Sequence, residues 1–399
     1  MVQLAAAGFI SLAPVSTLAT EATSLTEALQ EGDAQLSFRY RLETVDQTGL
    51  AKDAVASTLR TRLLFQTAKW QGWDGLLEVD NVSYLGNDNF NNTRNGQTNY
   101  PVVADPKGTD VNQALLGFQG EHGSVRLGRQ RLNLDNQRFI GGVGWRQNEQ
   151  TYDAASFTWT IRQEIRLEYC YINRVSRVFG PENGTPDKTL DANSHLVTGR
   201  VQLGSGTLSG YGFLLDFDNA AALSSQTIGA AYTNRFGDQR LAFPVRLEYA
   251  HQVDAGNSPV DYGASYLHTS IGVETRGLSA SLGFEKLGAD SGAMQAFATP
   301  LATLHKFNGW ADKFLSTPAA GLRDQYVSFG APVGSGRMDL TLHTFDADAG
   351  GTDYGRELDI SYSATIASRV NLLVKAARYQ TKGFASDTTK VWLMLTTAF

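Results

Sequence analysis

Arginines recur at alternate positions along the chain. Arg39 and Arg41 lie two residues apart, as do Arg60 and Arg62, and the chain has 24 arginines against 10 lysines. A guanidinium group stays charged, and its planar fork fits a carboxylate or a phosphate. A ladder of such groups lining an aqueous passage would attract anions and let them move between weak sites. The spacing therefore raises the hypothesis of an anion pathway.

The segment DAQLSFRYRLE (33–43) shows how a strand would position these residues. Side chains two apart share one face of a β-strand, so Leu36 and Tyr40 fall on one face and Arg39 and Arg41 on the other. The same parity in other segments predicts a shared polar, inward face. Its expected members are Arg39, Arg41, Arg60, Arg62, Arg126, Arg166, Arg200 and Arg246, with the acids Glu43, Glu168 and Glu248.

Two interpretations of this polar face stay open. In one, the arginines form the anion pathway. In the other, each arginine pairs with an inward acid and braces the wall. The acids available for bracing are Glu43, Glu78, Asp80, Glu168 and Glu248.

Two long segments are predicted to constrict the passage. GRQRLNLDNQRFIGGVGWRQNEQTYDA (128–154) is rich in Arg, Asn, Gln and Gly, and we expect its loop, 131–151, to fold inward. The second segment is residues 296–326, AFATPLATLHKFNGWADKFLSTPAAGLRDQY. It is longer and more aromatic than a loop that only connects two strands. We expect loop 288–322 to form a gate anchored by Phe307 and Trp310, with a short helix over HKFNGWADKFL. The alternatives are a solvated surface loop for the first and an external cap for the second.

Connection lengths place these segments in an all-β fold. About eighteen strands can be drawn from residue 33 to residue 399, joined by connections that are alternately short and long. Tight turns at one end and long loops at the other are typical of an outer-membrane β-barrel with short periplasmic turns and long extracellular loops. We predict a closed antiparallel transmembrane barrel of eighteen strands, with sixteen as the alternative. No linker divides the chain.

Composition agrees with a barrel and excludes other classes. No run of 18 apolar residues is present, so no transmembrane helix is expected. The net charge of −6 and the lack of a basic block argue against nucleic-acid binding. The single cysteine, Cys170, permits no intrachain disulfide.

The two ends of the chain predict export. Residues 1–22 resemble a signal peptide, although no Lys or Arg precedes Arg39, which leaves open a late start codon or a truncated beginning. Residues 23–32 would form a periplasmic leader. The final strand ends on Phe399 with apolar residues at alternate positions before it, which resembles the signal read by the outer-membrane assembly machinery. We expect the barrel, 33–399, to contact lipid and lipopolysaccharide in the bacterial outer membrane.

One pair of residues raises an enzymatic alternative. His268 and Ser270 share a strand face and resemble the catalytic pair of outer-membrane phospholipases. That pair must meet lipid, whereas Leu267, Ile271 and Val273 occupy the face expected to touch lipid. We therefore predict a polar lining and no enzyme.

Metal and cofactor sites are also not expected. Asp346, Asp348 and Asp353 lack the closing glutamate of a calcium loop, and the histidines have no ligand spacing.

Four segments resemble the alginate-export-type family of outer-membrane barrels: 24–47, 56–63, 127–154 and 299–326. The resemblance implies an eighteen-stranded barrel with an arginine-rich lumen that passes anionic polysaccharide. It also implies pore-loop roles for Arg129, Arg131, Arg138, Trp145 and Arg146. The predicted function is passive diffusion of small or polymeric anionic solutes such as acidic sugars. A plugged receptor barrel, and a lipid hydrolase using His268 and Ser270, are the alternatives.

Overall fold

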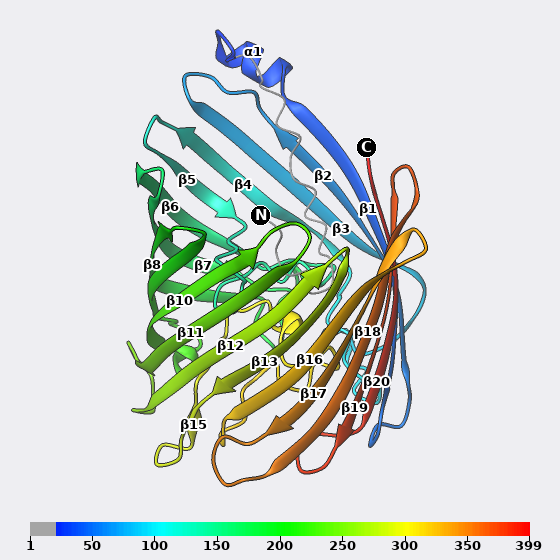
Figure 1. Ribbon diagram of the computed structural model, residues 1–399. Helices are drawn as coiled ribbons and strands as arrows, with labels where there is room; N and C mark the ends of the chain where they lie inside the picture. The colour runs from blue at the N-terminus through cyan, green and yellow to red at the C-terminus, as the bar shows by residue number, and fades with distance from the viewer. Residues whose placement is uncertain (1–20) are drawn as a thin grey trace.

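The computed structural model describes residues 21–399, and 18 of its strands form one closed antiparallel barrel. The first strand pairs with the second and also with the last, so the described sheet has no free edge (Figure 1). Backbone groups in lipid must find their partners within the protein, and closure satisfies this requirement. The predicted eighteen strands are confirmed, and the sixteen-strand alternative is wrong.

The barrel strands are β1 (Asp33–Gln47), β2 (Ala54–Gln66), β3 (Trp73–Asn89), β4 (Gly108–Gln119), β5 (Gly123–Gln130), β6 (Thr151–Arg162), β7 (Ile165–Ser176), β8 (Thr189–Leu203), β9 (Gly206–Leu215), β10 (Ser225–Gly237), β11 (Ala242–Asp254), β12 (Gly263–Thr275), β13 (Leu278–Leu287), β16 (Leu322–Val333), β17 (Gly336–Asp346), β18 (Asp353–Ala367), β19 (Val370–Thr381) and β20 (Thr388–Ala398). The remaining elements are α1 (Leu25–Gln30), the hairpin of β14 (Ala289–Asp290) and β15 (Gln295–Ala296), and the 3₁₀ turns η1 (Ala221–Leu223) and η2 (Leu304–Lys306).

Short turns gather at one end of the barrel and long loops at the other. The turns between β6 and β7 and between β12 and β13 are residues 163–164 and 276–277, whereas residues 131–150 and 288–321 form the longest loops. Two loops are shorter than predicted. The expected ranges 86–111 and 174–193 are 90–107 and 177–188, because the flanking strands are longer than expected.

Outward-facing side chains form an apolar belt. Leu63, Leu116, Ile228, Leu247 and Leu282 are all exposed on the outer wall. An aromatic girdle marks the short-turn end, as is usual where a barrel leaves the hydrocarbon. Its exposed members are Trp73, Trp159, Phe236, Phe243 and Phe329. No helix within residues 21–399 is long and apolar enough to cross a membrane.

Both ends of the described chain are fixed to the wall at the short-turn end. The side chain of Ser24 caps α1 by accepting from the Glu27 amide at 3.2 Å, and the Ala28 carbonyl accepts from the Ala68 amide at 3.0 Å. Phe399 exchanges two backbone hydrogen bonds with Leu36, at 2.9 and 3.1 Å. The predicted signal segment lies, apart from its last two residues, outside the described residues. Recognition of Phe399 by assembly machinery stays a prediction.

The two longest loops fold into the barrel and pair with each other (Figure 1). Ile140 and Leu301 form an isolated parallel bridge, and the Gly141 amide donates to the Leu301 carbonyl at 2.8 Å. Both Ile140 and Leu301 are fully buried. The loops therefore form one packed unit inside the lumen.

The short helix predicted over HKFNGWADKFL is wrong. Only η2 is helical there, and Asn308, Gly309 and Asp312 have positive φ values of 54°, 84° and 60°. The backbone amides of Trp310 and Ala311 donate to Asp359 and Glu357 on β18, at 3.1 and 2.6 Å. Inward acids of the wall thus take the amides that a helix would have used.

Tyrosine rings on the inner wall lie over glycines of the neighbouring strand. A Cβ added at Gly283 would be 2.0 Å from Cζ of Tyr326, its direct cross-strand partner, and one added at Gly229 would be 2.5 Å from Cζ of Tyr211. Each ring occupies the space that a side chain at the glycine position would need. Packing therefore requires glycine at these two positions. Gly212 differs, because an added Cβ there would meet nothing within 4 Å.

We predict that Gly283→Ala lowers the free energy of unfolding by about 1–3 kcal/mol, because Tyr326 must leave its place against β13. Gly212→Ala, also a strand position, should leave stability nearly unchanged. Urea unfolding of the barrel in lipid vesicles measures both effects. Equal stabilities of the two variants would contradict the packing argument.

Candidate functional site

Arg39 and Arg41 on β1 hold the loop 131–150 inside the barrel. Arg39 donates to the Gln147 side chain at 2.9 Å and to the Gly144 carbonyl at 2.7 Å. Arg41 contacts Asp105 at 3.3 Å, donates to the Trp145 carbonyl, and lies 4.3 Å from the centre of the Trp145 ring. Only 6% of Arg39 and none of Arg41 is exposed, so both clamp a loop instead of facing water.

A second cluster joins β2 and β3 to the same loop. Arg62 forms a bidentate pair with Asp80 at 2.6 and 2.7 Å, while Arg60 lies 3.4 Å from Glu149. Arg131 contacts Glu78 at 2.9 Å and also pairs with Glu149. Three cations thus face three carboxylates, and the cluster is neutral overall.

Glu149 shows how strongly this second cluster is coupled. Burial alone would raise the pKa of the Glu149 carboxyl, but Arg131, Arg62 and Arg60 more than offset it and hold that pKa well below its ordinary value. The loop carboxylate therefore stays charged and paired.

The loop 288–321 is held by a third set of contacts. Arg138 donates to Glu285 on β13 at 2.6 Å and to Asn308 at 3.0 Å, and its guanidinium lies 4.8 Å from the Phe307 ring. Arg146 lies 3.2 Å from both Glu43 on β1 and Asp312. Each loop arginine thus connects one loop to the other or to the wall.

Aromatic side chains pack at the junction of the two loops. Trp145 stacks on His305 with ring centres 4.2 Å apart and planes 8° from parallel. The ammonium group of Lys375 on β19 lies 3.6 Å from the Trp310 ring and 4.2 Å from the Trp145 ring. Lys375 is 2% exposed, so its Nζ atom contacts ring faces and the Nε2 atom of His305, 2.9 Å away, instead of water.

A different inner wall, formed by β5, β7 and β8, has arginines that the loops do not cover. Arg126 and the side chain of Arg166 are exposed, and Arg200 is half-exposed. Arg166 and Arg200 are direct cross-strand partners. Within residues 21–399, neither Arg126 nor Arg200 has an ion pair, while Arg166 lies 2.8 Å from Glu168. We call Arg126, Arg166 and Arg200 the basic wall.

The expected arginine ladder is therefore not continuous. The arginines of β1 and β2 support the bracing interpretation. The arginines of β5, β7 and β8 remain accessible from the lumen. Arg246 belongs to the braced group, because it pairs with Glu248 at 2.7 Å and with Asp135 of the inward loop. Glu248 also accepts from the Tyr211 hydroxyl at 2.8 Å.

The structure corrects the placement of Arg129. This residue lies on β5, on the same face as the exposed Leu127, and pairs with Asp153 at 2.7 Å. A strand side chain two positions from a lipid-facing leucine must also face outward. Arg129 is thus not part of a constriction loop.

His268 and Ser270 lie on the inward face of β12. Tyr266, on the same face, is fully buried, whereas Ile271 is exposed on the outer wall. The Nε2 atom of His268 is 2.9 Å from the Tyr326 hydroxyl. The pair therefore points away from the lipid that a phospholipase must reach.

Several residues of the site were missed from the sequence. Strand parity could have identified Glu285, Glu357, Asp359, Lys375 and Lys390 as inward charges. Asp105 and Gln147 gave no such signal, because they lie in loops without periodicity. Residues 21–399 contain no cluster of His, Cys, Asp and Glu arranged to hold a metal ion.

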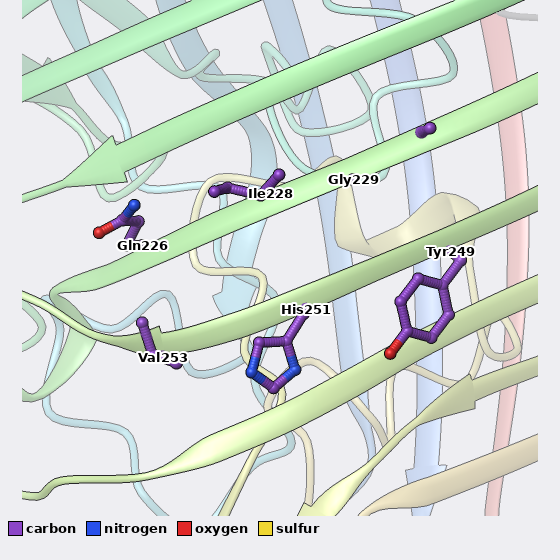
Figure 2. A pocket seen from close by; sticks show the side chains of 7 residues that line it. Gln226, Ile228, Gly229, Tyr249, His251 and Val253 are labelled. Atoms are coloured by element: carbon purple, nitrogen blue, oxygen red, sulfur yellow. The ribbon is translucent and has the colours of Figure 1, made fainter.

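A shallow hollow of about 510 Å³ lies on β10 and β11. Figure 2 shows Ile228 on β10 and Tyr249, His251 and Val253 on β11 along it. Ile228 and Tyr249 are more than half exposed, while the alternating Ala250 is buried, so the hollow is on the outer wall. It faces lipid and is not a passage for solutes.

A closed 18-stranded barrel with a charged lumen and inward loops is an outer-membrane channel. The model of the alginate export family matches residues 31–273, which is more than half of the chain, and the protein belongs to this family. No curated protein matches the chain.

Solved structures show the same fold at low sequence identity. OccK9 (OpdG) of Pseudomonas aeruginosa has a TM-score of 0.74 and 13% identity over 93% of this chain and 99% of its own. OccAB4 of Acinetobacter baumannii has a TM-score of 0.72 and 13% identity, with 92% and 98% covered. OpdK of Pseudomonas aeruginosa, solved with vanillate, has a TM-score of 0.70 and 12% identity, with 93% and 99% covered.

We predict that the double variant Arg39→Ala/Arg41→Ala releases the loop 131–150, because the Gly144 and Trp145 carbonyls lose their donors on β1. Removing one side of a buried ion pair costs about 3–5 kcal/mol. Limited trypsin digestion of the folded barrel should then cut after Arg138 and Arg146, which are 1% and 8% exposed before the change. Arg126→Ala/Arg200→Ala is the matched control and should keep both bonds protected. Protection that persisted in the first variant would disprove the clamp.

Proposed function

We propose that the protein passes small anionic solutes, acidic sugars among them, down their concentration gradient across the outer membrane. The supporting observation is the basic wall. Its three arginines are accessible from the lumen, whereas the arginines of β1 and β2 are engaged by carboxylates and loop carbonyls. A solute entering the lumen would meet these cations without displacing a loop.

The chemistry of the basic wall favours carboxylates. Among residues 21–399, Glu168 forms an ion pair with it, and Asp135, which is itself paired with Arg246, also interacts with Arg200. Three cations therefore retain a net positive charge. Arg166 and Arg200 lie side by side in register, and their forks could bind one carboxylate after another. OpdK, a channel of the same fold, was solved with vanillate, which is itself a carboxylate.

The inward loops favour small solutes or short oligosaccharides over long polymers. Both loops lie within the lumen, and Arg138, Trp145 and Arg146 are nearly fully buried there. A lumen narrowed in this way restricts the cross-section available for diffusion.

A plugged receptor barrel is the second candidate. The many buried ion pairs between the loops and the wall support this function, because they would keep the loops in the lumen. In that function, solutes would bind at the long-loop end and no steady current would cross the membrane.

We predict an anion-selective current when the purified barrel is inserted in a planar lipid bilayer. Arg126→Gln/Arg166→Gln/Arg200→Gln should lower the anion-to-cation permeability ratio by about fivefold, since two unit charges 4 Å apart interact by about 1 kcal/mol in water. The reversal potential across a KCl gradient measures this ratio. Raising the salt concentration should weaken the preference through screening.

The control variant changes three arginines on the outer wall and should keep the selectivity of the wild type. It is Arg323→Gln/Arg356→Gln/Arg378→Gln. A cation-selective current from the wild-type protein would refute the anion preference while leaving the channel in place. A bilayer that stays silent after verified insertion would favour the receptor.

A further inference from the structure

Four basic residues belong to β13, β16, β18 and β19, near the long-loop ends of these strands. These strands are drawn in yellow-green to orange-red in Figure 1. The four residues are Lys286, Arg323, Arg356 and Arg378, and we call them the outer cation row. Each is preceded or followed in its strand by a residue buried inside the barrel. Because side chains alternate along a strand, all four point outward.

The four positions lie between the ninth and the twelfth strand residue from the short-turn ends. Lys286 and Arg378 are the ninth residues of β13 and β19, counted from the short turns. Arg323 and Arg356 are the eleventh and twelfth residues of β16 and β18, counted from their short-turn ends. A tilted strand needs about 9–11 residues to cross the hydrocarbon. The outer cation row therefore lies where the outer-leaflet headgroups begin.

The outer cation row extends over five neighbouring strands, of which β17 contributes no member. Lys286 and Arg323 are direct cross-strand partners, and Arg378 is opposite Leu358, two residues from Arg356. Neighbouring strands are about 4.8 Å apart, so the five strands from β13 to β19 place the four cations within about 20 Å. This spacing allows several of them to contact one large headgroup.

No member of the outer cation row has an ion pair within residues 21–399. Arg323 donates to the Ala347 carbonyl at 3.0 Å, and Arg356 donates to the Gln380 side chain at 2.8 Å. Two acids are nearby. Asp346 is opposite Arg323 in register but forms no ion pair with it, and Asp353 is already paired with Lys382 at 2.6 Å.

Outward arginines elsewhere on the wall are neutralised. Arg129 pairs with Asp153 at 2.7 Å and Arg174 pairs with Asp191 at 3.0 Å, each through a neighbouring strand. The outer cation row is thus a local excess of positive charge on a wall that otherwise compensates its arginines. Its partner must supply negative charge from the membrane side.

We propose that the outer cation row binds the phosphate groups on the sugar headgroup of lipid A, the membrane anchor of lipopolysaccharide in the outer leaflet. Guanidinium groups bind phosphate through paired hydrogen bonds, and basic clusters at a membrane surface attract anionic headgroups. The apolar belt directly below the row accommodates the acyl chains of the same molecule. The site is on the opposite face of the wall from the pore, so it holds whether or not the channel prefers anions.

The test is direct binding of bisphosphorylated lipid A to the purified full-length barrel in detergent, followed by native mass spectrometry. The row variant replaces all four residues: Lys286→Gln, Arg323→Gln, Arg356→Gln and Arg378→Gln. We expect it to bind lipid A at least about tenfold more weakly than the wild type, since each basic residue near an anionic surface contributes about 1 kcal/mol. A charge-conserving variant with lysine at the three arginine positions should retain most of the binding.

Two controls separate this site from general charge effects. The first removes four exposed cations at the short-turn end: Lys69→Gln, Arg240→Gln, Arg276→Gln and Arg369→Gln. It should bind lipid A as the wild type does, as should the variant lacking the basic wall. Far-ultraviolet circular dichroism verifies that each variant is folded.

Three results would overturn the proposal: equal lipid A binding by the row variant and the wild type, equal loss in the short-turn control, or equal wild-type affinity for dephosphorylated lipid A. Equal wild-type affinity for phosphatidylglycerol vesicles would also overturn it, because the site would then recognise any anionic lipid.

Discussion

Charge pairing inside the barrel is the interaction on which the interior of this protein depends. Buried guanidinium groups are costly unless each finds carboxylates or carbonyls, and here Arg41 finds both Asp105 and the Trp145 carbonyl. The Arg138 guanidinium likewise donates to the Glu285 carboxylate and to the side-chain oxygen of Asn308. Loop and wall supply acceptors to each other: the Trp145 carbonyl of the loop accepts from Arg41 on β1, and Glu285 on β13 accepts from Arg138 of the loop. Breaking one pair would leave a charge without a partner in a dry interior.

This pairing divides the lumen into two regions. The wall of β1 and β2 is braced. On β2, Glu149 pairs with Arg60 and Glu78 lies 3.5 Å from Arg62. On β1, loop carbonyls accept from Arg39 and Arg41. The wall of β5, β7 and β8 keeps accessible cations. The contacts that hold the loops and the accessible cationic surface are therefore built from the same residue type, and they differ in whether a loop covers the guanidinium group.

The same principle applies on the outside of the barrel. Outward arginines on β5 and β7 meet aspartates on adjacent strands, whereas the outer cation row does not. A charge at the edge of the hydrocarbon is stable when a neighbour or a headgroup neutralises it. Membrane headgroups can thus neutralise arginines on the outer wall, as loop residues do on the inner wall.

The sequence by itself determined the strand count, the connection pattern and the face of most strand residues, because a side-chain period of two is a local property. It placed Arg39 and Arg126 on the inner wall alike. Only the tertiary structure decided that Arg39 meets Gln147, 108 residues away, while Arg126 stays exposed. It also replaced the helix expected at 305–315 with turns, because Asp359 and Glu357 take its amides. Loop placement depends on contacts between distant segments, and no local period encodes those contacts.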